Sequence, residues 1–207
     1  MAIIGIEGGI GTGKTLTGVW YIIGDLRAGK RIFTNVKLKG LTREEQSRVK
    51  YLIKDEIKQM FELVKTGKMS MKNSTIFLQE IHNYLDSRGS MTANNRLLSY
   101  WILQSRHAGQ GSCDIIFDTQ ELGQVDKRLR NNTDYLIRPL IVGYDTVDKK
   151  DARGHPDQDD EKKGKQIPKI IVLIGRTKLR HKWIDFKQTI DVSETREMYD
   201  THELVDF

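Results

Sequence analysis

The segment formed by residues 8–15 constrains the fold of this chain more than any other part of its sequence. It reads Gly-Gly-Ile-Gly-Thr-Gly-Lys-Thr and matches the pattern G-x-x-x-x-G-K-[ST] in full. A short apolar segment, residues 2–7, precedes it, and residues 14–28 have the composition of a helix that ends before Gly29. A glycine-rich loop between a strand and a helix is the setting in which this pattern binds phosphate. We therefore expect a phosphate-binding loop for a nucleoside triphosphate.

The chemistry of this loop follows from its residue types. Glycines let the backbone turn its amide groups inward around a phosphate, and the first turn of the helix adds the positive end of its dipole. Lys14 supplies a cation, and the hydroxyl of Thr15 is suited to binding Mg²⁺. The expected nucleotide-binding residues are Gly8, Gly9, Ile10, Gly11, Thr12, Gly13, Lys14, Thr15 and Leu16.

The rest of the chain alternates between strand-like and helix-like segments. Thr42 and Glu45 have the spacing of a capping box at the start of one helix. The order of segments predicts an α/β fold of the P-loop NTPase type, in which helices flank a mainly parallel sheet and a C-terminal β-hairpin follows. Strands are predicted at residues 31–36, 75–78, 114–119, 135–142, 169–175 and 183–186, and helices at residues 41–65 and 94–107, with a short helical stretch up to residue 130.

The length of 207 residues fits one domain, residues 1–207. Residues 148–166 carry six basic and six acidic side chains and almost nothing apolar, which predicts a mobile surface loop. The tail, residues 191–207, is expected to be a short helix or an extended arm. No apolar run approaches the roughly 20 residues of a membrane-spanning helix, and the N-terminus lacks the features of a signal peptide. The lone Cys113 cannot form an internal disulfide and fits a reducing compartment.

Residues 74–80 predict a buried strand whose end delivers acidic groups to a metal and to an attacking water. Families with such a strand usually end it in Asp-Glu, whereas this chain has Gln79 and Glu80. A neutral Gln79 can orient a metal-bound water but adds no charge to Mg²⁺. The expected metal residues are therefore Thr15, Gln79 and Glu80, and Glu80 is expected to polarise the water that attacks the γ-phosphate. The alternative is an exposed strand end, with Asp86 as the nearest competing acid.

Two further features are candidates for catalysis. Gln120 follows the predicted strand 114–119, which we expect beside the phosphate loop, so it is the candidate sensor of the γ-phosphate. Its alternative role is to cap the helix that follows. Arg128 and Arg130 are candidates for an arginine finger that reaches the nucleotide of a neighbouring subunit, with ordinary surface residues as the alternative. Two more arginines, Arg88 and Arg106, are further alternatives.

The net charge of +6 and the pI near 9.3 are compatible with a nucleic-acid partner. The basic residues are spread along the chain, however, so charge alone fits an ordinary solvated surface better than a nucleic-acid site. The candidate contacts to a nucleic-acid backbone are the turn at residues 176–182 and the loop around residues 162–165.

Taken together, the phosphate loop, the strand end at Glu80 and the strand end at Gln120 resemble those of the FtsK/HerA superfamily, especially the small genome-packaging ATPases of membrane-containing icosahedral viruses. A second resemblance, to zonula-occludens-toxin-like assembly ATPases of filamentous phages, is carried by residues 29–36, 105–107 and 199–203. The two resemblances together cover most of residues 1–205. The phosphate loop is the part of them that is specific by itself.

The resemblance implies an ATPase that uses ATP and Mg²⁺. It also implies a ring of about five or six subunits that moves double-stranded DNA into a preformed capsid. The implied partners are double-stranded DNA without sequence preference, other copies of the chain, and a capsid or portal-vertex protein, and the implied location is the host cytoplasm at assembling virions. The alternative is a filamentous-phage-type assembly or export ATPase. Such proteins normally carry a membrane helix after the ATPase domain, and its absence here favours the packaging motor.

Two readings from other classes use the same loop. A small-molecule kinase also needs a phosphate loop and a parallel sheet, but residues 148–166 are too acidic and too poor in glycine to resemble an arginine-rich lid. Gln79 in place of the usual Asp also fits a nucleotide-dependent scaffold that does not hydrolyse ATP. Stimulation of ATP turnover by long duplex DNA would be expected of the motor alone.

Overall fold

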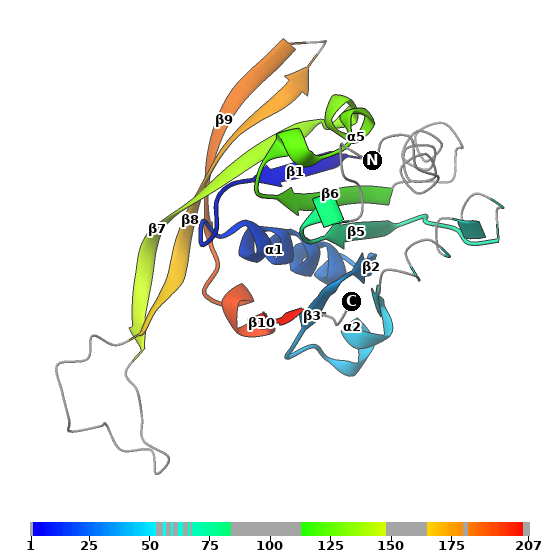
Figure 1. The fold of residues 1–207 in the computed structure, drawn as a ribbon. Helices are drawn as coiled ribbons and strands as arrows, with labels where there is room; N and C mark the ends of the chain where they lie inside the picture. The colour runs from blue at the N-terminus through cyan, green and yellow to red at the C-terminus, as the bar shows by residue number, and fades with distance from the viewer. Residues whose placement is uncertain are drawn as a thin grey trace.

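The computed structural model describes residues 2–52, 68–83, 113–147, 165–179 and 182–204, together with single positions between 56 and 66 (Figure 1). Among these residues, eight strands form one sheet in the order β4-β2-β5-β6-β1-β7-β8-β9. They are β1 (Ile3–Glu7), β2 (Arg31–Thr34), β4 (Val49–Tyr51), β5 (Ser74–Leu78), β6 (Cys113–Thr119), β7 (Tyr135–Val147), β8 (Lys165–Leu179) and β9 (Lys182–Asp191).

The described helices are few and short apart from the first. Three are α-helical: α1 (Lys14–Arg27), α2 (Arg43–Ser47) and α5 (Lys127–Asn132). Three single turns are 3₁₀: η1 (Ile81–Asn83), η3 (Leu122–Gln124) and η4 (Thr195–Met198). A second, two-stranded sheet pairs β3 (Val36–Leu38) with β10 (Tyr199–Leu204) in antiparallel fashion.

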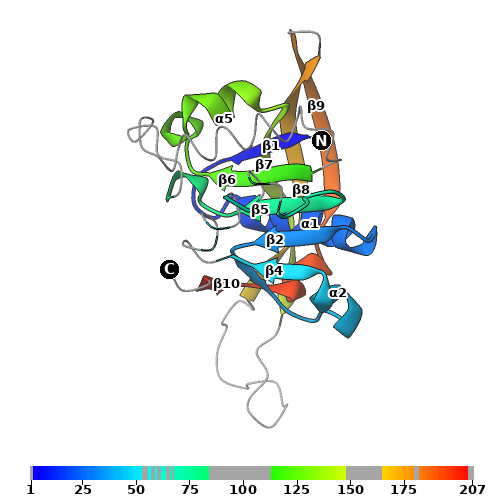
Figure 2. The same cartoon turned by 90° about the vertical axis from the view of Figure 1, so that its right-hand side faces the viewer.

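The six strands from β4 to β7 run parallel to one another, and β8 and β9 continue the sheet in antiparallel fashion. Figure 2 shows β1, β6, β5, β2 and β4 one below the other. The predicted fold class, an α/β P-loop NTPase sheet with antiparallel C-terminal strands, is confirmed. β1, which leads into the phosphate loop, lies in the middle of this sheet, between β6 and β7.

Alternate residues of the strands divide the core between the two faces of the sheet, as the period of a strand requires. On one face, Ile6, Phe77 and Ile116 pack with the apolar side of α1. On the other face, Ile3 and Phe117 pack with residues that include Leu129 of α5. The parallel strands are therefore covered on both sides, which explains why their sequences are almost continuously apolar.

Helix α1 approaches the sheet most closely at Gly18. A Cβ atom on this residue would lie 2.2 Å from the ring of Phe77, well inside van der Waals contact. We expect Gly18→Ala to lower the free energy of unfolding by about 1–3 kcal/mol, because the helix or the ring must move to make room.

The matched control for this prediction is Gly24→Ala in the same helix. A Cβ atom at Gly24 meets no heavy atom within 4 Å, so this change should raise the free energy of unfolding by about 0.5–1 kcal/mol. Denaturant titration of both variants measures the difference. Equal stability of the two variants would contradict the close packing of α1 on Phe77.

The outer strands β7, β8 and β9 form a long antiparallel arm at one side of the molecule (Figure 1). β8 has 15 residues, so it spans about 50 Å at ~3.3 Å per residue. The register between β7 and β8 shifts around Gly143, where a β-bulge interrupts the ladder. The predicted hairpin exists, but its strands are longer than the predicted segments, since residues 176–179 and 182 belong to the strands and not to a turn.

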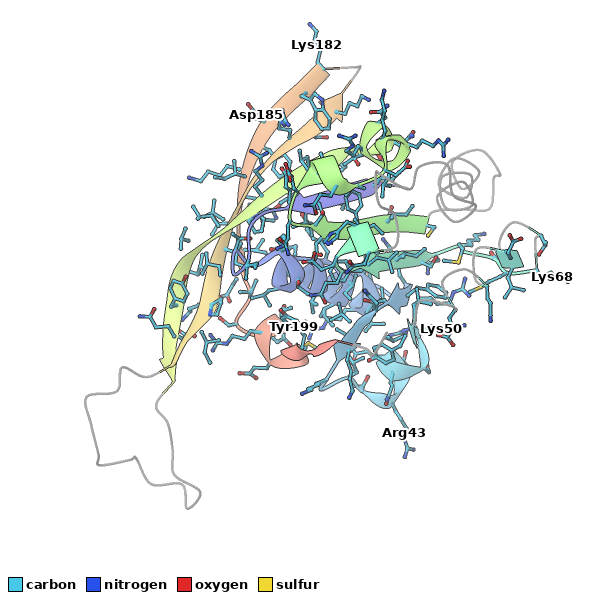
Figure 3. All side chains as sticks on the ribbon, in the orientation of Figure 1. Arg43, Lys50, Lys68, Lys182, Asp185 and Tyr199 are labelled. Atoms are coloured by element: carbon cyan, nitrogen blue, oxygen red, sulfur yellow. The ribbon has the colours of Figure 1, made fainter. Side chains whose placement is uncertain are left out.

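The C-terminal residues pack against α1, and β10 pairs with β3 outside the eight-stranded sheet. Tyr199 packs between the apolar clusters beside α1, and Arg27 of α1 forms a bidentate ion pair with Glu194. Figure 3 shows Tyr199 below α1. Both predicted forms of the tail occur, because η4 is a short helical turn and β10 is an extended strand.

The predicted helix at residues 41–65 is wrong over part of its length. The capping box of Thr42 and Glu45 is present, but α2 ends at Ser47 and residues 49–51 form the edge strand β4, which pairs with β2. The ladder to β2 includes a bond from the Ile32 amide to the Arg48 carbonyl and one from the Leu52 amide to the Thr34 carbonyl. Val49 and Tyr51, between these bonded positions, are residue types that favour strands. The single described positions 56, 59, 62 and 63 are helical. The predicted helix at residues 94–107 and positions 148–164 of the predicted mobile loop lie outside the described residues, whereas Lys165 and Gln166 already belong to β8.

Candidate functional site

The phosphate loop joins the end of β1 to the start of α1 (Figure 1). Gly11 and Gly13 have φ values of 78° and 91°, in the left-handed region that side-chain-bearing residues rarely adopt. The carbonyl oxygen of Gly9 accepts hydrogen bonds from the Lys14 ammonium group at 3.0 Å and from the Thr12 hydroxyl at 2.9 Å. The loop is thus shaped by its own contacts, and the positive charge of Lys14 is held within it.

The neighbouring strands anchor the entry to the loop. The Gly8 amide donates to the Thr119 carbonyl of β6 at 3.3 Å. The carboxylate of Glu7 accepts from the Leu122 amide at 2.8 Å and from the Arg138 guanidinium group at 2.7 Å. These bonds fix the loop relative to the end of β6 and to β7.

The chain ends of β5 and β6 meet beside the loop. The Asn35 side chain holds the backbone of Gln79, since it accepts from the Gln79 amide at 2.8 Å and donates to the Gln79 carbonyl at 3.0 Å. Glu80 has a φ of 51°, which is unusual for a residue other than glycine. Its amide donates to Asp118 Oδ1 at 2.6 Å, and this bond holds the turn that follows β5.

Asp118 lies at the centre of this group and is wholly buried. Its second oxygen, Oδ2, accepts a hydrogen bond from the Thr15 hydroxyl at 3.0 Å. Burial raises the pKa of Asp118 to about 7, because desolvation disfavours the carboxylate more than its hydrogen bonds favour it. The carboxyl group of Asp118 therefore links Thr15, in the first turn of α1, to the turn at Glu80.

One carboxylate oxygen of Glu80 is buried beside His82. Glu80 Oε2 is buried and accepts no hydrogen bond among the described residues, although His82 Nδ1 lies 3.3 Å away. His82 Nδ1 also lies 3.4 Å from the Thr119 hydroxyl. A buried carboxylate oxygen without a donor is costly on its own and is suited to a water or cation that arrives with a ligand.

The residues present fit a magnesium–nucleotide complex. The Thr15 hydroxyl and the Asp118 carboxyl group supply hard oxygen donors near the cation of Lys14. Glu80, whose amide Asp118 holds, adds a further carboxylate at the end of β5. Within the described residues, no group of three His, Cys, Asp or Glu side chains could hold a metal ion alone. Mg²⁺ is commonly bound by one or two carboxylates together with substrate phosphates, so a site of this composition is suited to Mg²⁺ carried by a nucleotide.

Other sequence candidates occupy varied positions. Ile10 is exposed at the tip of the loop, whereas the side chain of Leu16 is buried in the core, so Leu16 has only its backbone to offer a nucleotide. Gln120 is exposed and directly follows Thr119, whose carbonyl accepts from the loop. The N-cap positions of the next two helices are held by Glu121 and Asp126, and of these Asp126 accepts a capping hydrogen bond, from the Arg128 amide.

The two candidate arginines lie away from the loop of their own chain. Arg128 and Arg130 are on α5, whose Leu129 packs beside Ile3 at the beginning of β1, while the loop follows the end of β1 (Figure 1). A described arginine at the loop's edge of the sheet is Arg138, which contacts Glu7. Arg88, Arg106 and Asp86 lie outside the described residues.

Comparison with known proteins places the chain in a family. Residues 2–139 match the family model described as Zonular occludens toxin (Zot). The chain belongs to the Zot family. The N-terminal domain of zonular occludens toxin from Neisseria meningitidis has a similar structure, with 21% identity, a TM-score of 0.58, and coverage of 96% of this chain and 98% of that one. This likeness shows that the Zot-family fold extends beyond the matched residues to the outer strands.

A second solved structure is less similar. The genome packaging NTPase B204 from Sulfolobus turreted icosahedral virus 2, in complex with ATP-γ-S, is 15% identical, with a TM-score of 0.48 and coverage of 74% of this chain and 78% of that one. Among curated proteins, none matches the chain. Within the part of this Zot-family chain that the structure describes, no helix combines the length and apolar character needed to cross a bilayer.

Sequence reasoning did not single out Asp118. The acid was expected at the end of β5, and Asp118 was noted only as one of the residues that lead to Gln120. The available signal was Asp118 itself, a charged residue between the apolar run Ile115–Phe117 and Thr119. An acid in such a buried strand is rare unless it has a partner. Its partner is Thr15, 103 residues away along the chain, which only the fold reveals.

Proposed function

We propose that this Zot-family chain hydrolyses ATP with Mg²⁺ and that the released energy drives the assembly of a virus particle. The observation that carries the proposal is the hydrogen bond from Thr15 to Asp118, because it joins the phosphate loop to the turn that bears Glu80. In this arrangement the loop, Lys14 and the acidic strand ends belong to one site.

Each residue has a role in the proposed reaction. The loop amides and Lys14 bind the β- and γ-phosphates, and Thr15 and the acidic side chains hold the cation. Mg²⁺ would neutralise charge that develops on the phosphates. In the proposed reaction Glu80 orients the attacking water and receives its proton, and Gln120 contacts the γ-phosphate at the end of β6. The proposal for Glu80 is supported by its Oε2 atom, which is buried and accepts no hydrogen bond among the described residues.

We propose that the motor is a ring of copies of residues 1–207 that moves double-stranded DNA. Exposed apolar side chains on the outer strands, such as Leu140, Ile174 and Ile184, support association with other copies. In such a ring, Arg128 and Arg130 act only on a neighbour's nucleotide, since α5 lies away from its own loop. The further partner is a capsid or portal-vertex protein at virions that assemble in the host cytoplasm.

The proposed DNA contacts lie on the β8–β9 hairpin. Lys178, Lys182 and Lys187 are exposed there, and Figure 3 shows Lys182 at the tip, directed away from the body. Arg176 lies over the Trp183 ring, 5.4 Å from its centroid, and pairs across the strands with Asp185. A motor needs contacts to phosphates and not to bases, because grip on particular bases would stall it. Positions 162–164 and 180–181 of the two predicted basic segments lie outside the described residues.

The second candidate function is assembly or export of a virion without translocation of duplex DNA, as in filamentous-phage-type Zot-like ATPases. The family match favours it. The two candidates share the ATPase site and differ in the polymer on which the energy is used.

The test is the rate of ATP hydrolysis with and without long linear duplex DNA, together with the native mass of the assembly. We expect DNA to stimulate hydrolysis several-fold at low salt and less at high salt, since phosphate contacts are weakened by counterions. Changing Lys182 and Lys187 to Ser should reduce this stimulation without changing the rate in the absence of DNA. The same changes at Lys50 and Lys68, exposed far from the hairpin (Figure 3), should leave it intact. Hydrolysis that does not respond to DNA would favour the second candidate.

A further inference from the structure

We propose that Asp118 supplies the negative charge at the Thr15-bound cation, a role that the end of β5 leaves open because position 79 is Gln. The inference rests on the proposed ATPase function. It adds to the site a residue of β6, whereas Gln79 and Glu80 follow β5. Asp118 would act as a positioning group for the cation through Thr15 and as a source of charge beside it.

The sheet order places position 118 closer to the nucleotide than position 79. β6 lies between β5 and β1, so the end of β6 is the immediate neighbour of the loop. Leu78 of β5 pairs in register with Phe117 of β6, and Gln79 and Asp118 are the next residues on the two strands. A carboxylate at position 118 therefore lies at the same level of the sheet as position 79 and one strand nearer to Thr15.

The surroundings of Asp118 favour a charged ligand. Its carboxyl group is wholly buried, and the two hydrogen-bond donors that the described residues give it, the Thr15 hydroxyl and the Glu80 amide, are uncharged. Among the described residues, Asp118 has no ion pair within 4 Å. Lys14 interacts with Asp118 electrostatically but forms no ion pair with it among these residues. Burial of this carboxylate costs free energy, and a divalent cation at Thr15 would offset that cost.

A purely structural role makes a different prediction. Asp118 could serve only to hold the Glu80 turn, through its Oδ1 atom. Asp118→Asn keeps a side-chain oxygen that can accept from the Glu80 amide but removes the charge. A structural role should therefore tolerate this change, whereas a role toward the cation should not.

The experiment measures the affinity of the full chain for ATP-γ-S by calorimetry, once with Mg²⁺ and once with excess EDTA. Mg²⁺ should tighten binding to the wild type. In Asp118→Asn this gain should shrink by about 10- to 100-fold, the usual effect of removing a group that supports a metal ligand. Affinity in EDTA should change by less than about threefold, because the loop itself is intact.

The control is Asp114→Asn, four residues earlier on β6. Asp114 binds the Lys30 ammonium group at 2.7 Å and the Ala2 amide at 2.7 Å, at the opposite end of the strand. This variant tests the loss of a β6 carboxylate as such, and its Mg²⁺ dependence should match the wild type. Adding Gln79→Asp to Asp118→Asn should restore most of the lost Mg²⁺ dependence, because the charge returns at the neighbouring strand end.

If Asp118→Asn does not fold, Gln79→Asp in the wild-type background tests the proposal in its place. With Asp118 already in place, a second acid should tighten Mg²⁺-dependent binding by less than about threefold. A gain of about tenfold or more, or full Mg²⁺ dependence in Asp118→Asn, would overturn the assignment of Asp118. A wild type that binds no nucleotide in either buffer would instead overturn the proposed ATPase function and this inference with it.

Discussion

Lys14→Ala is expected to abolish ATP hydrolysis and to weaken nucleotide binding by about 10- to 100-fold, the range for a lost charge-assisted hydrogen bond to phosphate. Lys14 is 7% exposed and holds its ammonium group at the Gly9 carbonyl, inside the loop that would surround the phosphates. Alanine leaves the loop backbone unchanged but removes its only side-chain cation. Fluorescence titration with a labelled nucleotide and a phosphate-release assay measure the two effects.

The matched control is Lys50→Ala, which removes an exposed lysine on the edge strand β4. Its binding and hydrolysis should equal those of the wild type. Thermal unfolding of both variants checks that the fold survives. Hydrolysis by Lys14→Ala at the wild-type rate would refute the assignment of the loop to phosphate binding.

Glu80→Gln is expected to retain nucleotide binding and to slow hydrolysis by about 10²- to 10⁴-fold, the usual cost of losing a positioned general base. The amide has nearly the same shape as the carboxylate, so the turn at Glu80 and its bond to Asp118 should persist. What is lost is the ability of Oε2 to accept a proton from the attacking water. Single-turnover measurements of phosphate release separate this chemical step from binding.

Glu121→Gln is the control, because Glu121 is exposed just beyond the end of the neighbouring strand β6. It should hydrolyse ATP at the wild-type rate. If Glu80→Gln also keeps nearly the wild-type rate, the base lies elsewhere in the chain, and Asp86 is the next candidate to replace.

The part of the fold that local sequence specifies could be predicted well. Residues 3–27 form strand, loop and helix as expected, because the apolar run, the glycines and the helical segment are contiguous. The expected position of the strand before Gln120, beside the phosphate loop, is also confirmed, since β6 pairs with β1. The helix predicted at residues 41–65 is wrong at residues 49–51, because apolar residues with helical spacing, such as Val49, can also occupy a short edge strand.

The candidate site could be predicted only in part, for a related physical reason. The loop residues are neighbours in sequence, whereas the acid that contacts Thr15 comes from β6 and is brought there by the order of the strands. A search along the chain found Gln79 and Glu80 at one strand end but had no means to rank Asp118, on the next strand. The placement of Arg128 and Arg130 likewise depends on the path of α5, which runs back to the start of β1.

The most direct test of nucleotide binding by the loop is amide hydrogen exchange of the wild-type chain with and without ATP-γ-S and Mg²⁺. We predict that nucleotide slows exchange most strongly at the amides of residues 9–16, in the loop after β1 and the first turn of α1. A smaller effect is expected at residues 118–120, at the end of β6 and just beyond it. Lys14→Ala should lose this protection at the same nucleotide concentration. Exchange at residues 9–16 that is unchanged by saturating nucleotide would contradict the proposal that these amides surround the phosphates.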